Sequence, residues 1–144
     1  MGRRRVANQP IRLAAGAFIL NAGIGKLSAD EARAARLHGA AKGSFPFFES
    51  VPPEQFAKGL AVAEVALGAA LLAPFIPDRL AGLALTPFAG GLLWMYSQTD
   101  AMHEPNSLRP TQAGTAVAKD VWLLGIGLTL LASGRRRAKA NRRG

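Results

Sequence analysis

Long apolar segments alternate with short polar ones along this chain. Apolar residues dominate positions 11–27, 54–76, 79–97 and 113–133, and charged or turn-forming residues gather between them and at both ends. A helix rises about 1.5 Å per residue, so about 20 residues cross the ~30 Å hydrocarbon core of a bilayer. The pattern therefore predicts an all-α integral membrane protein, built as a four-helix transmembrane bundle.

The polar segment 28–53 interrupts this pattern after the first apolar segment. Ser28 and Glu31 stand at capping-box spacing and Gly43 follows the helical pattern, which predicts a short surface helix. The aromatic run FPFF at 45–48 then suits the level of the lipid headgroups. We expect residues 28–53 to cover the outer surface of the bundle.

The composition favours a single membrane domain over residues 1–144. Hydrophobic residues make up 49% of the chain and charged residues only 19%, although the net charge is +9. The basic clusters at the start and in the tail 134–144 adjoin apolar helices, which is typical of cytoplasmic flanks in contact with anionic lipid. We therefore expect these clusters to contact the lipid bilayer and not to bind nucleic acid.

The distribution of basic residues predicts the topology, since cytoplasmic loops carry more Lys and Arg. With four spans, ten basic residues lie on the side of both termini, namely Arg3, Arg4, Arg5, Arg79, Arg135, Arg136, Arg137, Lys139, Arg142 and Arg143. Five lie on the other side, namely Arg33, Arg36, Lys42, Lys58 and Arg109. We expect a multi-pass protein of the bacterial cytoplasmic membrane with both termini in the cytoplasm.

One stripe of the first predicted helix combines charge with small residues. Arg12, Gly16, Ile19, Gly23 and Lys26 follow one another at helical spacing and so share a face. Glycines on such a face allow close packing between helices in lipid. We expect the stripe to face protein; the alternative is that Arg12 and Lys26 only anchor the helix ends at the membrane surface.

Charged residues inside the predicted spans are the candidate site. Glu64 falls about 16 Å into its helix, and Lys119 and Asp120 about 10 Å into theirs, with Lys26 and Asn21 at the same outer half. Charges at such depth are expensive unless they are paired. We expect Glu64 to pair with Lys119 first, which leaves Asp120 to Lys26.

Two interpretations of this cluster stay open. It either holds the four helices in register, or it binds a polar ligand head such as a quinone carbonyl or relays protons. Pro87 permits the same two interpretations, because a helix kink serves packing or makes room for a ligand.

The sequence lacks the residues that most kinds of enzymatic catalysis require. The chain has no cysteine, no metal triad, no phosphate-binding loop and no nucleophile beside a base, so we expect no catalysis by the chain alone and no covalently bound cofactor. His38 and His103 fall outside the predicted spans, which disfavours haem ligation and predicts solvated positions.

Three motifs resemble the DoxX-like family of small bacterial four-helix membrane proteins. They are Arg12 with G-x-x-x-x-x-x-G-x-x-K from Gly16 to Lys26, AEVALG at 63–68, and KDVWLLGIGLTLL from Lys119 onward. The resemblance covers roughly residues 10–133 and leaves segment 28–53 and the basic tail unmatched.

The resemblance implies a link to quinone-linked redox complexes. We expect a non-catalytic accessory or scaffolding subunit with other membrane subunits, or copies of itself, as partners. The alternative is a quinone-linked redox component or small-molecule binder that uses Lys26, Glu64, Lys119 and Asp120. A proton-coupled transporter is a weaker third alternative, because four short helices rarely enclose a pathway.

Overall fold

The computed structural model describes residues 2–141, with side chains described at residues 7–133, 139 and 140. This part of the chain is helical and contains no strand. The elements are α1 (Gly2–Leu27), α2 (Glu31–Ser44), η1 (Pro46–Ser50), α3 (Pro53–Leu72), α4 (Asp78–Gln98), η2 (Asp100–Met102), α5 (Thr115–Ala118) and α6 (Val121–Asn141). Within the described residues, three helical stretches are long and apolar enough to cross a membrane: Pro53–Leu72, Asp78–Gln98 and Thr115–Ser133.

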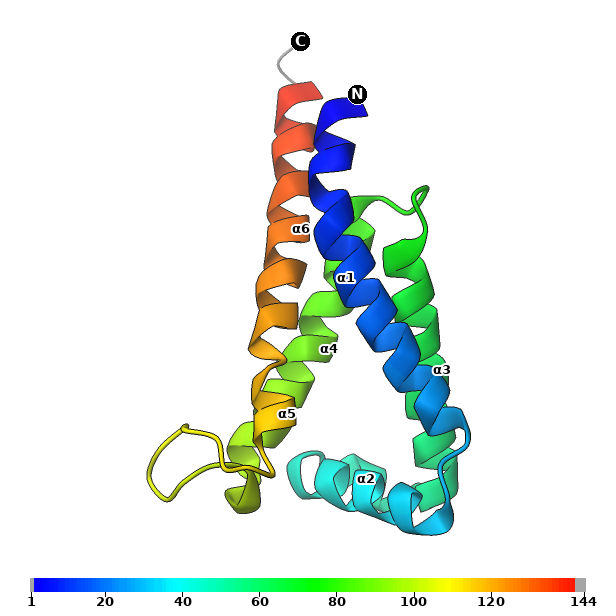
Figure 1. Ribbon diagram of the computed structural model, residues 1–144, viewed down its shortest axis with the longest axis vertical. Coiled ribbons are helices and arrows are strands. Elements are labelled where there is room, and N and C mark those ends of the chain that lie inside the picture. Colours follow the sequence, from blue (N-terminus) through cyan, green and yellow to red (C-terminus); the bar gives the residue numbers. More distant parts are fainter. Residues whose placement is uncertain (1, 142–144) are drawn as a thin grey trace.

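Two helix pairs build the molecule. Helix α1 packs along α3, and α4 packs along α6. Figure 1 shows the two pairs converging toward the end that holds both termini and separating toward the opposite end, where α2 lies across the opening. The predicted short helix within segment 28–53 is therefore present, at the end opposite the termini.

Small residues set the distance within each pair. A Cβ atom on Gly68 of α3 would lie 2.6 Å from the backbone nitrogen of Leu20 in α1. A Cβ atom on Gly127 of α6 would lie 2.6 Å from the hydroxyl oxygen of Thr86 in α4. Neither contact is sterically possible, so any larger residue would push the two helices apart.

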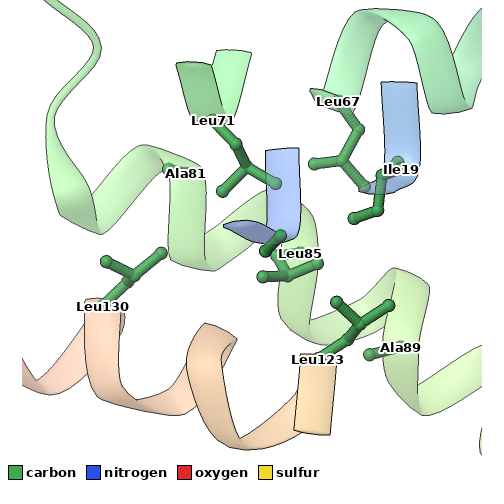
Figure 2. Packing of buried hydrophobic residues seen from close by; sticks show 9 residues of the cluster. Ile19, Leu67, Leu71, Ala81, Leu85, Ala89, Leu123 and Leu130 are labelled. Atoms are coloured by element: carbon green, nitrogen blue, oxygen red, sulfur yellow. The ribbon is translucent and has the colours of Figure 1, made fainter. Parts of the chain in front are cut away.

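Leucine side chains join the two pairs where they converge. Leu71 of α3, Leu85 of α4 and Leu130 of α6 are fully buried, and Ile19 of α1 is 2% exposed. Figure 2 shows these side chains meeting from all four long helices. The apolar core therefore holds α1 and α3 against α4 and α6.

Several predicted boundaries are corrected by the structure. The second apolar segment was expected to be helical to residue 76, but α3 ends at Leu72, because Pro74 keeps Ala73 in extended backbone. The first helix begins at Gly2 instead of residue 11. Asp30, and not Ser28, caps α2 by accepting a hydrogen bond from the Arg33 amide at 2.8 Å.

The predicted helix 113–133 is interrupted at Lys119 and Asp120, which separate α5 from α6. Here the Asp120 amide donates to the Val117 carbonyl and the Trp122 amide donates to the Lys119 carbonyl. Both bonds span three residues instead of four, which tightens the backbone locally. The predicted basic tail 134–144 continues α6 to Asn141, and its last residues, 142–144, lie outside the described residues.

Candidate functional site

The stripe predicted on the first helix faces protein, as expected. Arg12 and Ile19 are each 2% exposed, and Gly16 and Gly23 lie against α3. A Cβ atom on Gly23 would lie 2.9 Å from the Cβ atom of Glu64. Glycine at this position therefore makes room for Glu64 between the two helices.

Lys26 and Glu64 form an ion pair between α1 and α3. The Lys26 Nζ atom lies 2.8 Å from the Glu64 Oε2 atom, with the side chains 15% and 6% exposed. The ammonium also donates a longer bond, 3.4 Å, to the Ala22 carbonyl one turn earlier. An ammonium has three N–H donors and a carboxylate has two acceptor oxygens, so the pair retains hydrogen-bonding capacity.

The expected pairing of Glu64 with Lys119 is wrong. Glu64 is bonded to Lys26, and Lys119 is exposed at the junction of α5 and α6. Lys119 and Asp120 are adjacent on one helical turn, so the turn that buries Asp120 directs Lys119 outward. Asn21 is also exposed, on the opposite face of α1 from the stripe, and does not join the cluster.

Asp120 approaches the pair from the other half of the molecule. Its residue exposure is 9%, and its carboxylate faces the same cavity as Lys26 and Glu64. No hydrogen bond or ion pair to this carboxylate is present within the described residues. Asp120 is therefore a buried acidic group that lacks a partner in the described part of the chain.

A cavity of about 710 Å³ separates the two helix pairs at this level. Its size falls within the range of about 300 to 1,000 Å³ typical of small-molecule pockets. Six of the seven phenylalanines of the chain line it, namely Phe18, Phe45, Phe47, Phe48, Phe56 and Phe88. Pro87 lies in the same wall, so the proline of α4 borders the cavity.

The cavity is lined by residues of both helix pairs and of α2, the helix that lies across the open end between the diverging pairs in Figure 1. Phe18 and Phe47 line the cavity and are still 60% and 67% exposed. The cavity therefore opens to the surroundings of the bundle at these residues. Arg33 and Arg36 of α2 are exposed and border it at the end opposite the termini.

A second ionic site lies toward the end that holds the termini. The Arg12 Nη1 atom lies 2.9 Å from the Asp78 Oδ1 atom, with side-chain exposures of 2% and 4%. Asn8 donates to the other oxygen of Asp78 at 3.0 Å. Both oxygens of the buried carboxylate are therefore bonded.

Arg12 uses every donor of its guanidinium, which has five N–H groups. Besides Asp78, the acceptors are the carbonyls of Ala70, Leu71, Ala73 and Ile76, at 2.8 to 2.9 Å. The last carbonyls of a helix lack partners within the helix and attract positive charge. Arg12 therefore closes the C-terminal end of α3, a role that the sequence patterns did not reveal.

Each histidine has a ring nitrogen within hydrogen-bond distance of a backbone carbonyl. His38 was expected to be solvated, but it is 7% exposed, and its Nε2 atom lies 2.8 Å from the Phe48 carbonyl. His103 bonds to the carbonyls of Ser97 and Glu104. Across the described residues, no three His, Cys, Asp or Glu side chains are arranged to hold a metal ion.

Comparison with protein-family models, with curated proteins and with solved structures finds no match to this chain. The resemblance to the DoxX-like family therefore rests on the three sequence motifs alone.

Proposed function

We propose that the chain is a four-helix membrane protein in which α1 is the fourth crossing. Among its described side chains, α1 exposes the large apolar residues Leu13, Phe18, Ile24 and Leu27, with Asn21 as an exposed polar residue. Its two inward charges, Arg12 and Lys26, are paired within the bundle. Such a helix suits lipid although its average hydropathy is lower than that of the other three.

We further propose that both termini lie in the cytoplasm of a bacterial cell. The two termini lie at one end of the molecule in Figure 1, which an even number of crossings requires. The basic residues near both termini favour the cytoplasmic side for that end.

Single cysteines test this topology, because the chain has none of its own. Ser107→Cys should react with an impermeant thiol reagent in intact cells, and Ala140→Cys should react only after permeabilisation. Labelling of Ala140→Cys but not of Ser107→Cys in intact cells contradicts the topology.

Within this framework, we propose that the protein binds a lipid-soluble ring compound of the quinone class. The observation that carries the proposal is the apolar cavity into which Lys26, Glu64 and Asp120 project. Lined mainly by apolar groups with a few polar ones, it matches the common form of a ligand pocket. The phenylalanines suit the ring, and the remaining N–H capacity of Lys26 suits an oxygen on it.

In this proposal the protein is a non-catalytic accessory subunit that holds the compound for a partner in a redox complex of the membrane. The three motifs that resemble the DoxX-like family support that role. The exposed apolar side chains on α3, α4 and α6, such as Val62, Leu83 and Leu128, support a surface in contact with lipid or with other membrane subunits.

Extraction of the purified protein tests this function. The wild-type chain, isolated from bacterial membranes in mild detergent, should retain a quinone detectable by mass spectrometry after solvent extraction. A folded variant with Lys26→Met and Glu64→Gln should retain at least about tenfold less, because the polar contacts of the ring are gone. Equal amounts in both preparations contradict the function.

A further inference from the structure

Asp120 requires a hydrogen-bond donor from the ligand, whereas the Lys26–Glu64 pair alone does not require one. The pair is already balanced in charge, with one short bond of 2.8 Å between its members. The Asp120 residue is 9% exposed, its carboxylate has no partner within the described residues, and its oxygens remain accessible from the cavity. An occupant that displaces solvent from this carboxylate must replace the lost hydrogen bonds, so the position favours an occupant that supplies a donor.

The atoms that face the cavity define what that occupant must offer. An ionised carboxylate accepts hydrogen bonds and cannot donate one, whereas the Lys26 ammonium donates and cannot accept. A ring hydroxyl can donate a hydrogen bond to the Asp120 carboxylate and accept one from the Lys26 ammonium. A ring carbonyl or an ether oxygen can only accept, and so serves Lys26 but leaves Asp120 unpaired.

The walls of the cavity indicate an aromatic body behind this hydroxyl. Six phenylalanines and two methionines, Met95 and Met102, line the space. Aromatic rings pack favourably edge to face with one another, and methionine sulfur contacts ring edges favourably. The exposed position of Phe18 leaves the cavity open on its lipid-facing side, where an alkyl chain can extend.

We propose that the cavity selects a lipid-soluble aromatic ring that carries a hydroxyl group, and that Asp120 accepts the hydrogen bond from this hydroxyl. This inference rests on the proposed function and adds a preference for the hydroxyl-bearing form of the ligand. Asp120 is then the residue that distinguishes it from ring compounds that offer only acceptors.

A matched pair of probes tests the preference. The dissociation constants of 4-nonylphenol and of its methyl ether are measured by isothermal titration calorimetry on the full chain in lipid nanodiscs, with empty nanodiscs as the blank. The phenol should bind about 10- to 100-fold more tightly than the ether, because the ether leaves the carboxylate unpaired.

Substitution of Asp120 tests whether this residue causes the preference for the phenol over the ether. In Asp120→Asn the amide supplies a donor as well as an acceptor, so the ratio of the two constants should fall below about threefold. Lys119→Met is the matched control, since Lys119 is adjacent but exposed and should leave the ratio unchanged. The ratio compares two probes on one protein and is therefore insensitive to a fraction of unfolded chain.

Each outcome separates this inference from the function on which it rests. Equal binding of both probes by the wild-type chain overturns the hydroxyl preference but leaves the cavity as a binding site. A preference that persists unchanged in Asp120→Asn overturns the role of Asp120. No binding of either probe, together with no quinone retained by the purified protein, overturns the proposed function itself.

Discussion

Arg12 and Lys26 stand on the same stripe of α1, one toward each end of the bundle, and their surroundings differ in one respect. Each of the five N–H groups of Arg12 donates a hydrogen bond, and both oxygens of the Asp78 carboxylate accept one. Lys26 has one short bond to Glu64 and faces a cavity that also receives the unpaired carboxylate of Asp120. Two buried ion pairs on one helix thus differ in how completely they are satisfied.

This difference separates a structural role from a binding role. A buried charge whose bonds are all made by its own chain has nothing left for a ligand, and its removal leaves unpaired groups. A buried cluster with remaining donors and acceptors beside open space can take a ligand into that space. We therefore propose that Arg12–Asp78 serves the fold and that Lys26–Glu64–Asp120 serves binding.

The largest effect is expected at the saturated site. Arg12→Met leaves Asp78 charged without its cation and frees four carbonyls near the end of α3, so the free energy of unfolding should fall by at least about 3 to 5 kcal/mol. Denaturant titration in detergent measures the change. Arg109→Met, at an exposed residue outside the cavity wall, is the control and should stay within about 0.5 kcal/mol of the wild type. A loss below about 1 kcal/mol for Arg12→Met would contradict the structural role of the Arg12–Asp78 pair.

A smaller effect is expected at the Lys26–Glu64 pair, because the cavity admits partial solvation. Lys26→Met and Glu64→Gln should each cost about 1 to 3 kcal/mol of stability, and the double variant less than the sum of the two. A double-mutant cycle measures this coupling. The control cycle between Glu64 and the exposed Lys119 should give none; coupling there instead would restore the pairing expected from sequence.

Asp120→Asn should be nearly neutral or slightly stabilising for the protein without ligand. The change removes an unpaired buried charge and keeps the shape of the side chain, so the free energy of unfolding should rise by about 0.5 to 1 kcal/mol. The same denaturant titration measures it. A loss above about 2 kcal/mol would mean that Asp120 already has a structural partner, contrary to its assignment to binding.

The smallest effects are expected at Asn21 and Lys119, two residues that the sequence placed in the cluster. Both are exposed, so Asn21→Ala and Lys119→Met should change stability by less than about 0.5 kcal/mol. Neither should alter the amount of ligand retained. A marked loss of ligand in either variant would extend the site beyond the cavity.

The sequence predicted the long helices and the inward stripe of α1 because both depend on local periodicity. The positions of Gly16 and Gly23 at helical spacing were enough to predict close packing. The end of α3 was misjudged because Pro74 stops the helix although apolar residues continue after it.

The partners within the site were harder to predict. Helical rise gives the depth of Glu64, Lys26 and Lys119 but does not say which helices are neighbours or how each is rotated. The packing of α1 on α3 decided the partner of Glu64, and the tight turn at residues 119–120 decided which side chain is buried. The cavity itself depends on the separation of the two helix pairs, which no single segment encodes.

The Arg12–Asp78 site was missed for a related reason. Asp78 follows a turn directly after Pro77, where a charged residue is ordinarily solvated, and Arg12 has five acceptors spread over the turn and the end of α3. Only the folded chain brings these carbonyls together.

The most direct test of binding in the cavity fills it while leaving every charged residue in place. Gly91 lines the cavity, where an added Cβ atom meets only Phe45, at 3.9 Å, whereas a Cβ atom on the adjacent Gly90 meets nothing within 4 Å and Gly90 is not part of the cavity wall. Retained quinone is measured by mass spectrometry on purified Gly91→Leu and Gly90→Leu proteins of equal stability. We predict that Gly91→Leu retains at least about tenfold less than the wild type, because its side chain occupies the space of the ring, and that Gly90→Leu retains the wild-type amount. Equal retention by both variants would contradict binding in the cavity.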